Sequence, residues 1–216
     1  MKTVQIKSDK LKKELLKILR QNGVREDVAK YMVKGIIQAS LRGIDSHGIR
    51  LFPHYLEGFK QGRLNKSPNY EFKKTGASTG VFDANHAPGH AAGMEGMKYA
   101  IKLAKSSGIG AVAVSNSSHF GVAAYFAFQA AKEDMIGLSF THATAHVVPY
   151  SGIKPFLGNN PFCFVAPCAD EDPFCLDMAT TTATFNKVKT YAEKKKKLPA
   201  SWALDEHGMS TTDATK

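Results

Sequence analysis

Residues 109–140 read IGAVAVSNSSHFGVAAYFAFQAAKEDMIGLSF, and this stretch decides the fold. The apolar run at 109–114 is typical of a short strand. Residues 120–132 have the length and composition of a buried helix, and residues 135–140 form a second apolar strand. Because a strand–helix–strand unit of this spacing commonly returns to one sheet, we predict a parallel, right-handed crossover and an α/β fold.

The chain before this unit is helical. Ser8 is expected to cap a first helix, because apolar residues follow it at helical spacing. The same spacing and the glycines that interrupt it predict helices over about residues 8–22, 26–42 and 55–61. Turn-rich residues 64–80 then separate two predicted units. These are an N-terminal helical subdomain, residues 1–64, and an α/β domain, residues 65–216.

The rest of the α/β domain alternates strands, helices and loops. Short strand-like pieces lie near residues 70–72 and 81–82, and small residues predict a tightly packed helix over 88–105. A Pro- and Gly-rich loop at 149–161 leads into a hairpin of residues 162–165 and 174–176. A last helix is predicted over 181–197, followed by turns over 199–212.

Composition excludes several classes of protein. A chain of 216 residues, 43% of them hydrophobic, buries a sizeable core without disulfides or metal. No apolar run approaches ~18 residues, so no membrane span is expected, and the charged N-terminal pattern is unlike a signal peptide. We therefore expect a cytoplasmic protein. Its three cysteines, an odd number, are expected to be buried thiols.

The net charge of +10 invites a nucleic-acid interpretation, but only five of the 29 positive residues are Arg. Bidentate contacts to bases and phosphates favour Arg, so we expect no nucleic-acid partner. The run Lys194 to Lys197 is interpreted as the solvated end of a helix.

Two apparent ligand motifs do not meet their structural requirements. The segment 108–113 matches G-x-G-x-x-A, but it enters a strand, whereas a dinucleotide fingerprint follows a strand and opens a helix. We interpret Gly108 as a helix C-cap. The pairs His86/His90 and His142/His146 have metal-like spacing without a convincing helix, so no metal is expected.

Two histidine motifs carry possible chemistry. In Asp45-Ser46-His47-Gly48 the histidine lies between amphipathic helices, where it either donates a proton near neutral pH or closes a turn. In Asn116-Ser117-Ser118-His119 the histidine follows a strand at the sheet edge that binds ligands. At the start of the following helix, the helix dipole disfavours the protonated form of His119. The small polar residues 116–118 suit a helix N-cap equally well.

These motifs occur in order with four others, which read LGNNP at 157–161, LDMATT at 176–181, PASWALD at 199–205 and TTD at 211–213. Together they resemble the type-2 malate/L-lactate dehydrogenase family, which also includes sulfolactate, ureidoglycolate and diketogulonate oxidoreductases and cyclic-imine carboxylate reductases. The resemblance implies a homodimeric, nicotinamide-dependent oxidoreductase of small 2-hydroxy or 2-oxo acids. It also implies a non-Rossmann α/β fold with a mixed sheet and flanking helices.

The resemblance assigns roles by position. His47 is expected to be the general acid/base, His119 to line the same pocket, and Asp177 to lie between substrate and cofactor. Ser46 and Arg50 are expected to bind the substrate. The residues expected to contact the cofactor are Gly158, Asn160, Pro161, Asp177, Met178, Ala179 and Thr180. Hydride transfer to a ketone leaves an oxyanion, so a proton donor must lie within hydrogen-bond reach.

This sequence departs from the family pattern in two respects. The family commonly has Arg four residues after the motif histidine, where this chain has Leu51. Either the substrate differs from malate and lactate, or Arg50 substitutes for the missing arginine; we expect Arg50 to bind the substrate. Family members also continue beyond the position of Lys216, so the C-terminal segment of the family fold is expected to be missing here. NAD is the expected cofactor because no Arg follows Arg63, while Lys187 or Lys189 leaves NADP open. A cyclic imino-acid reductase and a non-catalytic basic interaction module are the alternative functions.

Overall fold

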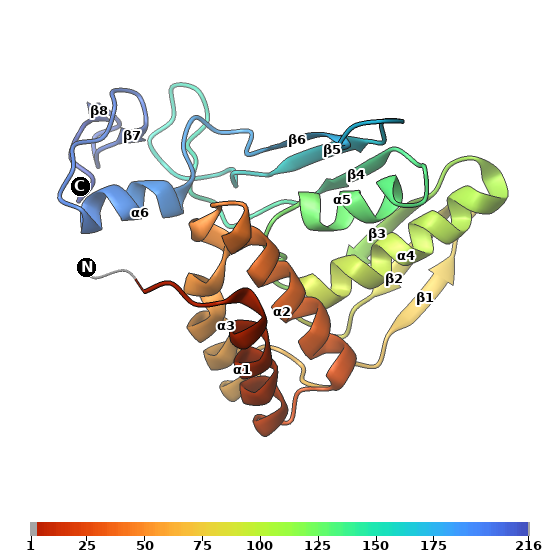
Figure 1. Cartoon of the computed structure of the whole chain (residues 1–216). Coiled ribbons are helices and arrows are strands. Elements are labelled where there is room, and N and C mark those ends of the chain that lie inside the picture. The colour runs from red at the N-terminus through yellow and green to blue at the C-terminus, as the bar shows by residue number, and fades with distance from the viewer. Residues whose placement is uncertain (1–3, 216) are drawn as a thin grey trace.

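The computed structural model describes residues 4–215 and is a mixed α/β structure (Figure 1). It contains two 3₁₀ turns, η1 (Asp45–His47) and η2 (Ile49–Leu51). The helices are α1 (Ser8–Gln21), α2 (Glu26–Leu41), α3 (Phe52–Lys60), α4 (Gly89–Ser107), α5 (Ala124–Ala131) and α6 (Phe185–Glu193). The strands are β1 (Glu71–Lys74), β2 (Thr79–Asp83), β3 (Ala111–Ser115), β4 (Gly137–Phe140), β5 (Phe162–Ala166), β6 (Phe174–Met178), β7 (Ala203–Leu204) and β8 (Ser210–Thr211).

The helices α1, α2 and α3 form the predicted N-terminal cluster. Their apolar faces bury a core that includes Leu19, Met32, Ile36 and Phe59. Ala91 of α4 belongs to the same core, so this cluster packs directly against the α/β part of the chain. The division into residues 1–64 and 65–216 stays a prediction.

The first sheet is mixed, as predicted, but the crossover lies elsewhere. β1 pairs antiparallel with β2, and β2 pairs parallel with β3. The helix that connects the two parallel strands is α4, whose glycines permit close packing: a Cβ at Gly96 would lie 2.7 Å from Val114.

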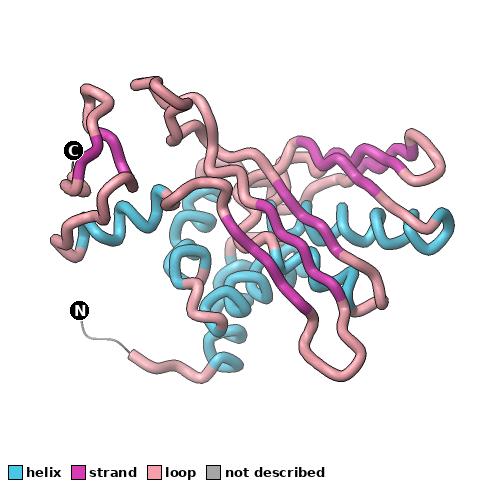
Figure 2. Tube along the Cα trace, turned by 90° about the horizontal axis from the view of Figure 1, so that it is seen from above, coloured by secondary structure: helices cyan, strands magenta, loops and turns pink. Residues whose placement is uncertain are grey.

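The predicted crossover from 109–114 to 135–140 is wrong, because β3 and β4 belong to different sheets. β4, β5 and β6 form a separate antiparallel sheet that includes the predicted hairpin. α5 packs on this second sheet so closely that a Cβ at Gly137 would lie 2.3 Å from the Ala127 carbonyl oxygen. Viewed from above, the strands form separate groups, with the small β7–β8 hairpin apart from both (Figure 2).

Several helix ends differ from the predictions. Ser8 is the first residue of α1 and makes no side-chain cap. α5 begins at Ala124, four residues later than predicted, and no side chain of the 116–118 cluster caps it. Instead the Ser118 hydroxyl accepts a 3.0 Å hydrogen bond from the Gly89 N–H, which caps α4.

The C-terminal region and the cysteines bring further corrections. α6 is shorter than predicted, and the 199–212 segment contains the β7–β8 hairpin rather than turns alone. Only Cys163 is buried, whereas Cys168 and Cys175 are exposed. Gly108 is confirmed as the C-cap of α4, with φ +79°, and Lys194 to Lys197 are exposed beyond α6 as predicted.

Candidate active site

The His47 loop is held against α2 by a glycine and a serine. A Cβ at Gly48 would lie 2.2 Å from the Ser40 hydroxyl oxygen, so only glycine lets the loop approach so closely. The same hydroxyl accepts a 2.9 Å hydrogen bond from the Ile49 N–H. At the head of the loop, Ser46 Oγ lies 2.8 Å from His47 Nδ1. Ser46 therefore fixes the imidazole and leaves His47 Nε2 for other partners.

His119 lies beside His47 and is oriented by a buried tyrosine. The two imidazole rings stack with their centroids 5.6 Å apart. The hydroxyl of Tyr55, which is 1% exposed, lies 2.7 Å from His119 Nδ1. The sequence predicts Tyr55 only as part of a helix over residues 55–61, and nothing in its spacing distinguishes it from a core residue. Its contact with His119 joins segments 64 residues apart.

Asp177 of β6 is the third residue of the group. Its Oδ2 accepts a 2.8 Å hydrogen bond from the backbone N–H of Ala124 at the start of α5. Burial raises the pKa of Asp177, while that N–H and the neighbouring His47 oppose the rise. The structure thus brings together His47, His119 and Asp177 from three distant segments of the chain.

Both site histidines favour the neutral form. Burial lowers the pKa of His47, and the Asp177 carboxylate partly counteracts this. The pKa of His119 falls to about 4, first through burial of the ring and then through His47, His54 and Arg63. The residue as a whole is nevertheless exposed. The expected helix dipole is not the cause, since α5 begins only at Ala124.

A further histidine lies beneath the site. His90 is 1% exposed, and neither ring nitrogen has a hydrogen-bond partner within residues 4–215. Its ring meets Tyr55 edge to face at 5.3 Å, and a Cβ at Gly121 would lie 2.6 Å from its Nε2. Burial and the neighbouring His119 and His47 lower the pKa of His90 to about 3. The sequence singled it out only for its spacing from His86.

Arg50, unlike His47 and His119, is paired with an acidic side chain at the surface. Its guanidinium forms an ion pair with Glu193 of α6, with Nη2 2.5 Å and 2.7 Å from the two carboxylate oxygens. Both side chains are more than 40% exposed. A substrate-binding role for Arg50 stays a prediction, and it requires exchange of this surface partner.

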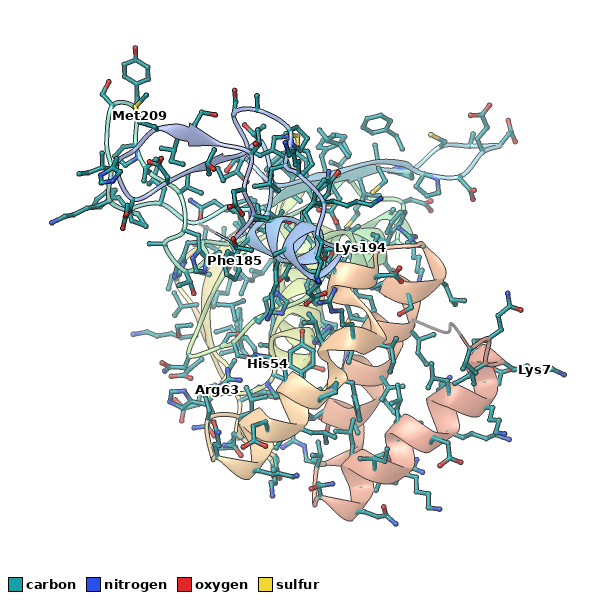
Figure 3. The ribbon with its side chains drawn as sticks, turned by 90° about the vertical axis from the view of Figure 1, so that its left-hand side faces the viewer. Lys7, His54, Arg63, Phe185, Lys194 and Met209 are labelled. Carbon is teal, nitrogen blue, oxygen red and sulfur yellow. The ribbon has the colours of Figure 1, made fainter. Side chains whose placement is uncertain are left out.

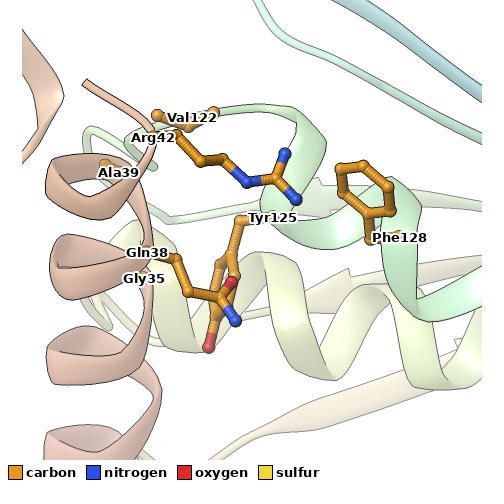
Figure 4. Close-up of a pocket in the computed structure, with 7 residues that line it drawn as sticks. All are labelled: Gly35, Gln38, Ala39, Arg42, Val122, Tyr125 and Phe128. Atoms are coloured by element: carbon orange, nitrogen blue, oxygen red, sulfur yellow. The ribbon is translucent and has the colours of Figure 1, made fainter. Parts of the chain in front are cut away.

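Arg42 occupies a small cavity between α2 and α5. Its guanidinium lies over the Phe128 ring, 4.3 Å from the centroid, with Gln38, Val122 and Tyr125 lining the same cavity (Figure 4). Arg42 also opposes the rise in the pKa of Asp177 that burial causes, so the two charges interact.

The expected cofactor residues gather where the 157–161 loop meets the end of β6. Asn159 contributes a carbonyl oxygen that accepts hydrogen bonds from the N–H and hydroxyl of Thr180, at 3.0 Å and 3.2 Å. Asn160 Oδ1 accepts a 3.0 Å hydrogen bond from Ala143 N–H. A Cβ at Gly158 would lie 2.2 Å from the Ala143 carbonyl oxygen, so a larger residue would disturb the loop.

These residues fit the nicotinamide end of a cofactor. Met178, the residue that follows Asp177 at the end of β6, is 49% exposed and offers apolar surface at this end of the strand. An aromatic ring with an amide group needs such a surface next to polar groups. Pro161 and Ala179 lie in the two chain segments that the Asn159–Thr180 hydrogen bonds join. Each contact role stays a prediction.

Two other properties bear on the class of protein. Within residues 4–215, no three His, Cys, Asp or Glu side chains cluster as metal ligands do. None of the helices in the described part of the chain combines the length and apolarity needed to cross a bilayer.

Comparison with known proteins identifies the family. The sequence profile named Malate/L-lactate dehydrogenase matches residues 6–216. Malate dehydrogenase of Pyrococcus horikoshii is 38% identical over 209 residues, which cover 97% of this chain and 58% of the relative. Malate/(S)-sulfolactate dehydrogenase of Methanothermus fervidus is 39% identical over 199 residues, covering 92% of this chain and 58% of the relative.

Comparison with solved structures points to the same family. A crystal structure of malate dehydrogenase from Entamoeba histolytica superposes with a TM-score of 0.95 at 34% identity, covering 99% of this chain and 60% of that one. The fold and the ordered motifs thus define the class, an α/β fold of the malate/L-lactate dehydrogenase type without a Rossmann fingerprint. The chain belongs to the malate/L-lactate dehydrogenase family. It spans about three fifths of the length of these relatives.

Proposed function

We propose that this protein is an oxidoreductase that transfers a hydride between NAD and a small 2-hydroxy or 2-oxo acid. The observation that carries the proposal is the grouping of His47, His119 and Asp177 beside the loops expected to bind the nicotinamide. Family membership supports the same chemistry, since its relatives include malate and malate/(S)-sulfolactate dehydrogenases.

His47 is proposed as the group that exchanges a proton with the substrate oxygen. Ser46 holds Nδ1, so Nε2 is the nitrogen available to the substrate. In the oxidation of a hydroxy acid, neutral His47 accepts the hydroxyl proton; in the reduction of a 2-oxo acid, protonated His47 returns it. The lowered pKa of His47 leaves it mainly neutral at pH 7, which favours its action as a base.

The neighbouring residues are proposed to support this proton transfer. The Asp177 carboxylate stabilises protonated His47, because the two groups interact electrostatically. Tyr55 fixes the ring of His119, so neutral His119 presents its other nitrogen to the substrate. A bound nicotinamide cofactor would supply or accept the hydride. Arg50 is proposed to bind the substrate carboxylate after exchanging Glu193 for it.

The test is NADH and NADPH oxidation by the full-length protein with a panel of 2-oxo acids. Turnover is expected, and His47→Ala is expected to lower kcat by roughly 10²- to 10⁴-fold with the fold intact. His207→Ala is the matched control, because its side chain is 78% exposed on the C-terminal hairpin. A chain that neither turns over any acid nor quenches cofactor fluorescence contradicts the proposal. Near-normal kcat in His47→Ala removes this residue from the mechanism.

The remaining expectations stay predictions. The homodimer is expected only from the resemblance, and the cytoplasmic location only from the sequence pattern. The preference for NAD over NADP rests on the arginine distribution and is tested separately below.

A further inference from the structure

Arg63 follows the C-terminus of α3 and folds back over that helix. Its Nη2 lies 3.3 Å from His54 Nε2 (Figure 3). The absence of a side chain at Gly58 makes room for it, since a Cβ there would lie 2.8 Å from Arg63 Nη2. Arg63 and His54 are both exposed, so their polar ends meet solvent. This pair is the cationic rim.

The cationic rim connects directly to the candidate active site. The His54 ring contacts the Tyr55 ring with centroids 5.8 Å apart. Tyr55 in turn hydrogen-bonds His119, which stacks on His47. An unbroken series of contacts therefore runs from Arg63 to the proposed proton donor. Arg63 and His54 also interact electrostatically with His119, so both side chains lie near the same space.

The charges around the cationic rim are unbalanced. No carboxylate of residues 4–215 lies within ion-pair distance of Arg63, whereas Arg50 is paired with Glu193. The nearby acid on α3, Glu57, accepts a hydrogen bond from Gln61 instead. Arg42, the other arginine near the site, lies over Phe128 in the cavity between α2 and α5. Among residues 4–215, Arg63 is thus the guanidinium on the Tyr55–His119 side that has no carboxylate partner.

A guanidinium in this position suits a second anionic group on the substrate. Its planar fork matches carboxylate, sulfonate and phosphate oxygens. His47 would face the 2-oxo group, so a group at the opposite end of a short acid would extend past His119 toward the rim. We propose that Arg63, supported by His54, binds this second anionic group and makes the protein selective for dianionic 2-oxo and 2-hydroxy acids. The inference rests on the proposed function, because it assigns the substrate class of the same site.

Turnover of two matched substrates tests the proposal. Oxaloacetate and 2-oxobutyrate share a four-carbon 2-oxo acid skeleton and differ in the second carboxylate. Wild type is expected to favour oxaloacetate in kcat/KM. Arg63→Gln is expected to reduce that preference about 10- to 100-fold, mainly through KM for oxaloacetate, as loss of a charged hydrogen bond implies. Arg63→Lys should restore part of the preference, because it keeps the charge without the fork.

The matched control is Arg20→Gln, since Arg20 is paired with Glu26 on the outer helices. It is expected to leave the preference unchanged. An unchanged preference in Arg63→Gln, or an equal loss in Arg20→Gln, overturns the proposal.

A binding measurement separates this inference from the proposed function. Succinate and butyrate are titrated against the histidine ring signals of the chain by NMR, which needs neither cofactor nor turnover. Succinate is expected to bind wild type more tightly than butyrate, and Arg63→Gln is expected to remove the difference. If no 2-oxo acid is turned over while this difference is seen, the proposed function fails and the rim proposal stands. Equal binding of both acids by wild type contradicts the rim proposal.

Discussion

The carboxylate of Asp177 accepts a 2.8 Å hydrogen bond from the backbone N–H of Ala124, so the end of β6 is tied to the first residue of α5. The same carboxylate interacts electrostatically with His47. Asp177 therefore makes two different contacts. The hydrogen bond from Ala124 needs only an acceptor oxygen, whereas the interaction with His47 needs a negative charge. A substitution that keeps the oxygen and removes the charge separates the two.

Asp177→Asn is expected to shift the pH dependence of 2-oxo acid reduction to lower pH. Reduction needs protonated His47, so kcat/KM falls as the pH rises through the pKa of His47, which lies below its usual value of 6.5. The Asp177 charge raises that pKa, so its removal lowers it further. Steady-state kinetics between pH 4.5 and 8, for both proteins, measure the midpoint.

The control is Asp177→Ala, which lacks the acceptor oxygen as well. It is expected to unfold more easily than Asp177→Asn, by roughly 1 kcal/mol, as loss of a helix N-cap implies. Urea unfolding at pH 7 compares the two. A midpoint that stays in place or moves upward in Asp177→Asn shows that Asp177 does not tune His47.

His90 is expected to make the protein sensitive to acid. Its pKa is lowered to about 3 by burial, whereas an unfolded chain protonates histidine near 6.5. Below about pH 6.5 the unfolded state therefore binds the extra proton, and stability falls as the pH decreases toward 3. Replacing His90 by Leu removes this contribution, which amounts to about 1.4 kcal/mol per pH unit.

The measurement is urea unfolding of wild type and His90→Leu at pH 7, 6 and 5. The difference in unfolding free energy between the two is expected to change with pH in favour of the variant. His207→Leu, at an exposed position, serves as the control and should follow wild type. If the unfolding free energies of wild type and His90→Leu change equally with pH, His90 is not the cause of the acid sensitivity.

The sequence predicted most elements because their signals are local. Gly108 ends α4 in the left-handed conformation that its position implied, and the β5–β6 hairpin lies where its flanking turn placed it. The partner of a strand is not a local property. The prediction joined residues 109–114 to 135–140, whereas β3 pairs with β2 and β4 lies in another sheet.

In the candidate site, too, the sequence predicted the residues that lie in local motifs and missed the contacts between distant segments. His47, His119 and Asp177 carry motifs that the sequence displays. Tyr55 acts through its contact with His119, 64 residues further along the chain, and its position in the sequence is that of an ordinary helix residue. The partner of Arg50 was equally invisible, because Glu193 lies 143 residues further along the chain.

Glu193→Gln is expected to strengthen binding of an acid substrate if Arg50 grips its carboxylate. The exposed Arg50–Glu193 pair contributes at most about 1 kcal/mol to stability, so the variant should fold normally. Freed from its competitor, Arg50 should lower KM for a 2-oxo acid. Arg50→Ala should instead raise KM by an amount worth about 1.5–3 kcal/mol. Steady-state titrations of both variants measure KM for the 2-oxo acid. An unchanged KM in Arg50→Ala shows that another residue binds the substrate carboxylate.

NADH is expected to be preferred over NADPH. An NADP site needs positive charge at the ribose 2′-phosphate, and Arg is the usual partner because its planar fork matches phosphate. No Arg follows Arg63, although every expected cofactor residue does. Of the two candidate lysines, Lys187 has its ammonium 4.5 Å from the centre of the Trp202 ring, so binding a phosphate would require it to leave that ring.

Paired titrations with NADH and NADPH, at saturating 2-oxo acid, measure the preference. A kcat/KM that favours NADPH tenfold or more, equivalent to about 1.4 kcal/mol, contradicts it. Lys187→Ala and Lys189→Ala then locate the charge, because loss of the 2′-phosphate contact should raise KM for NADPH and leave KM for NADH unchanged. If NADH is preferred in wild type, both lysine variants should keep that preference, since neither side chain would contact a phosphate that NADH lacks.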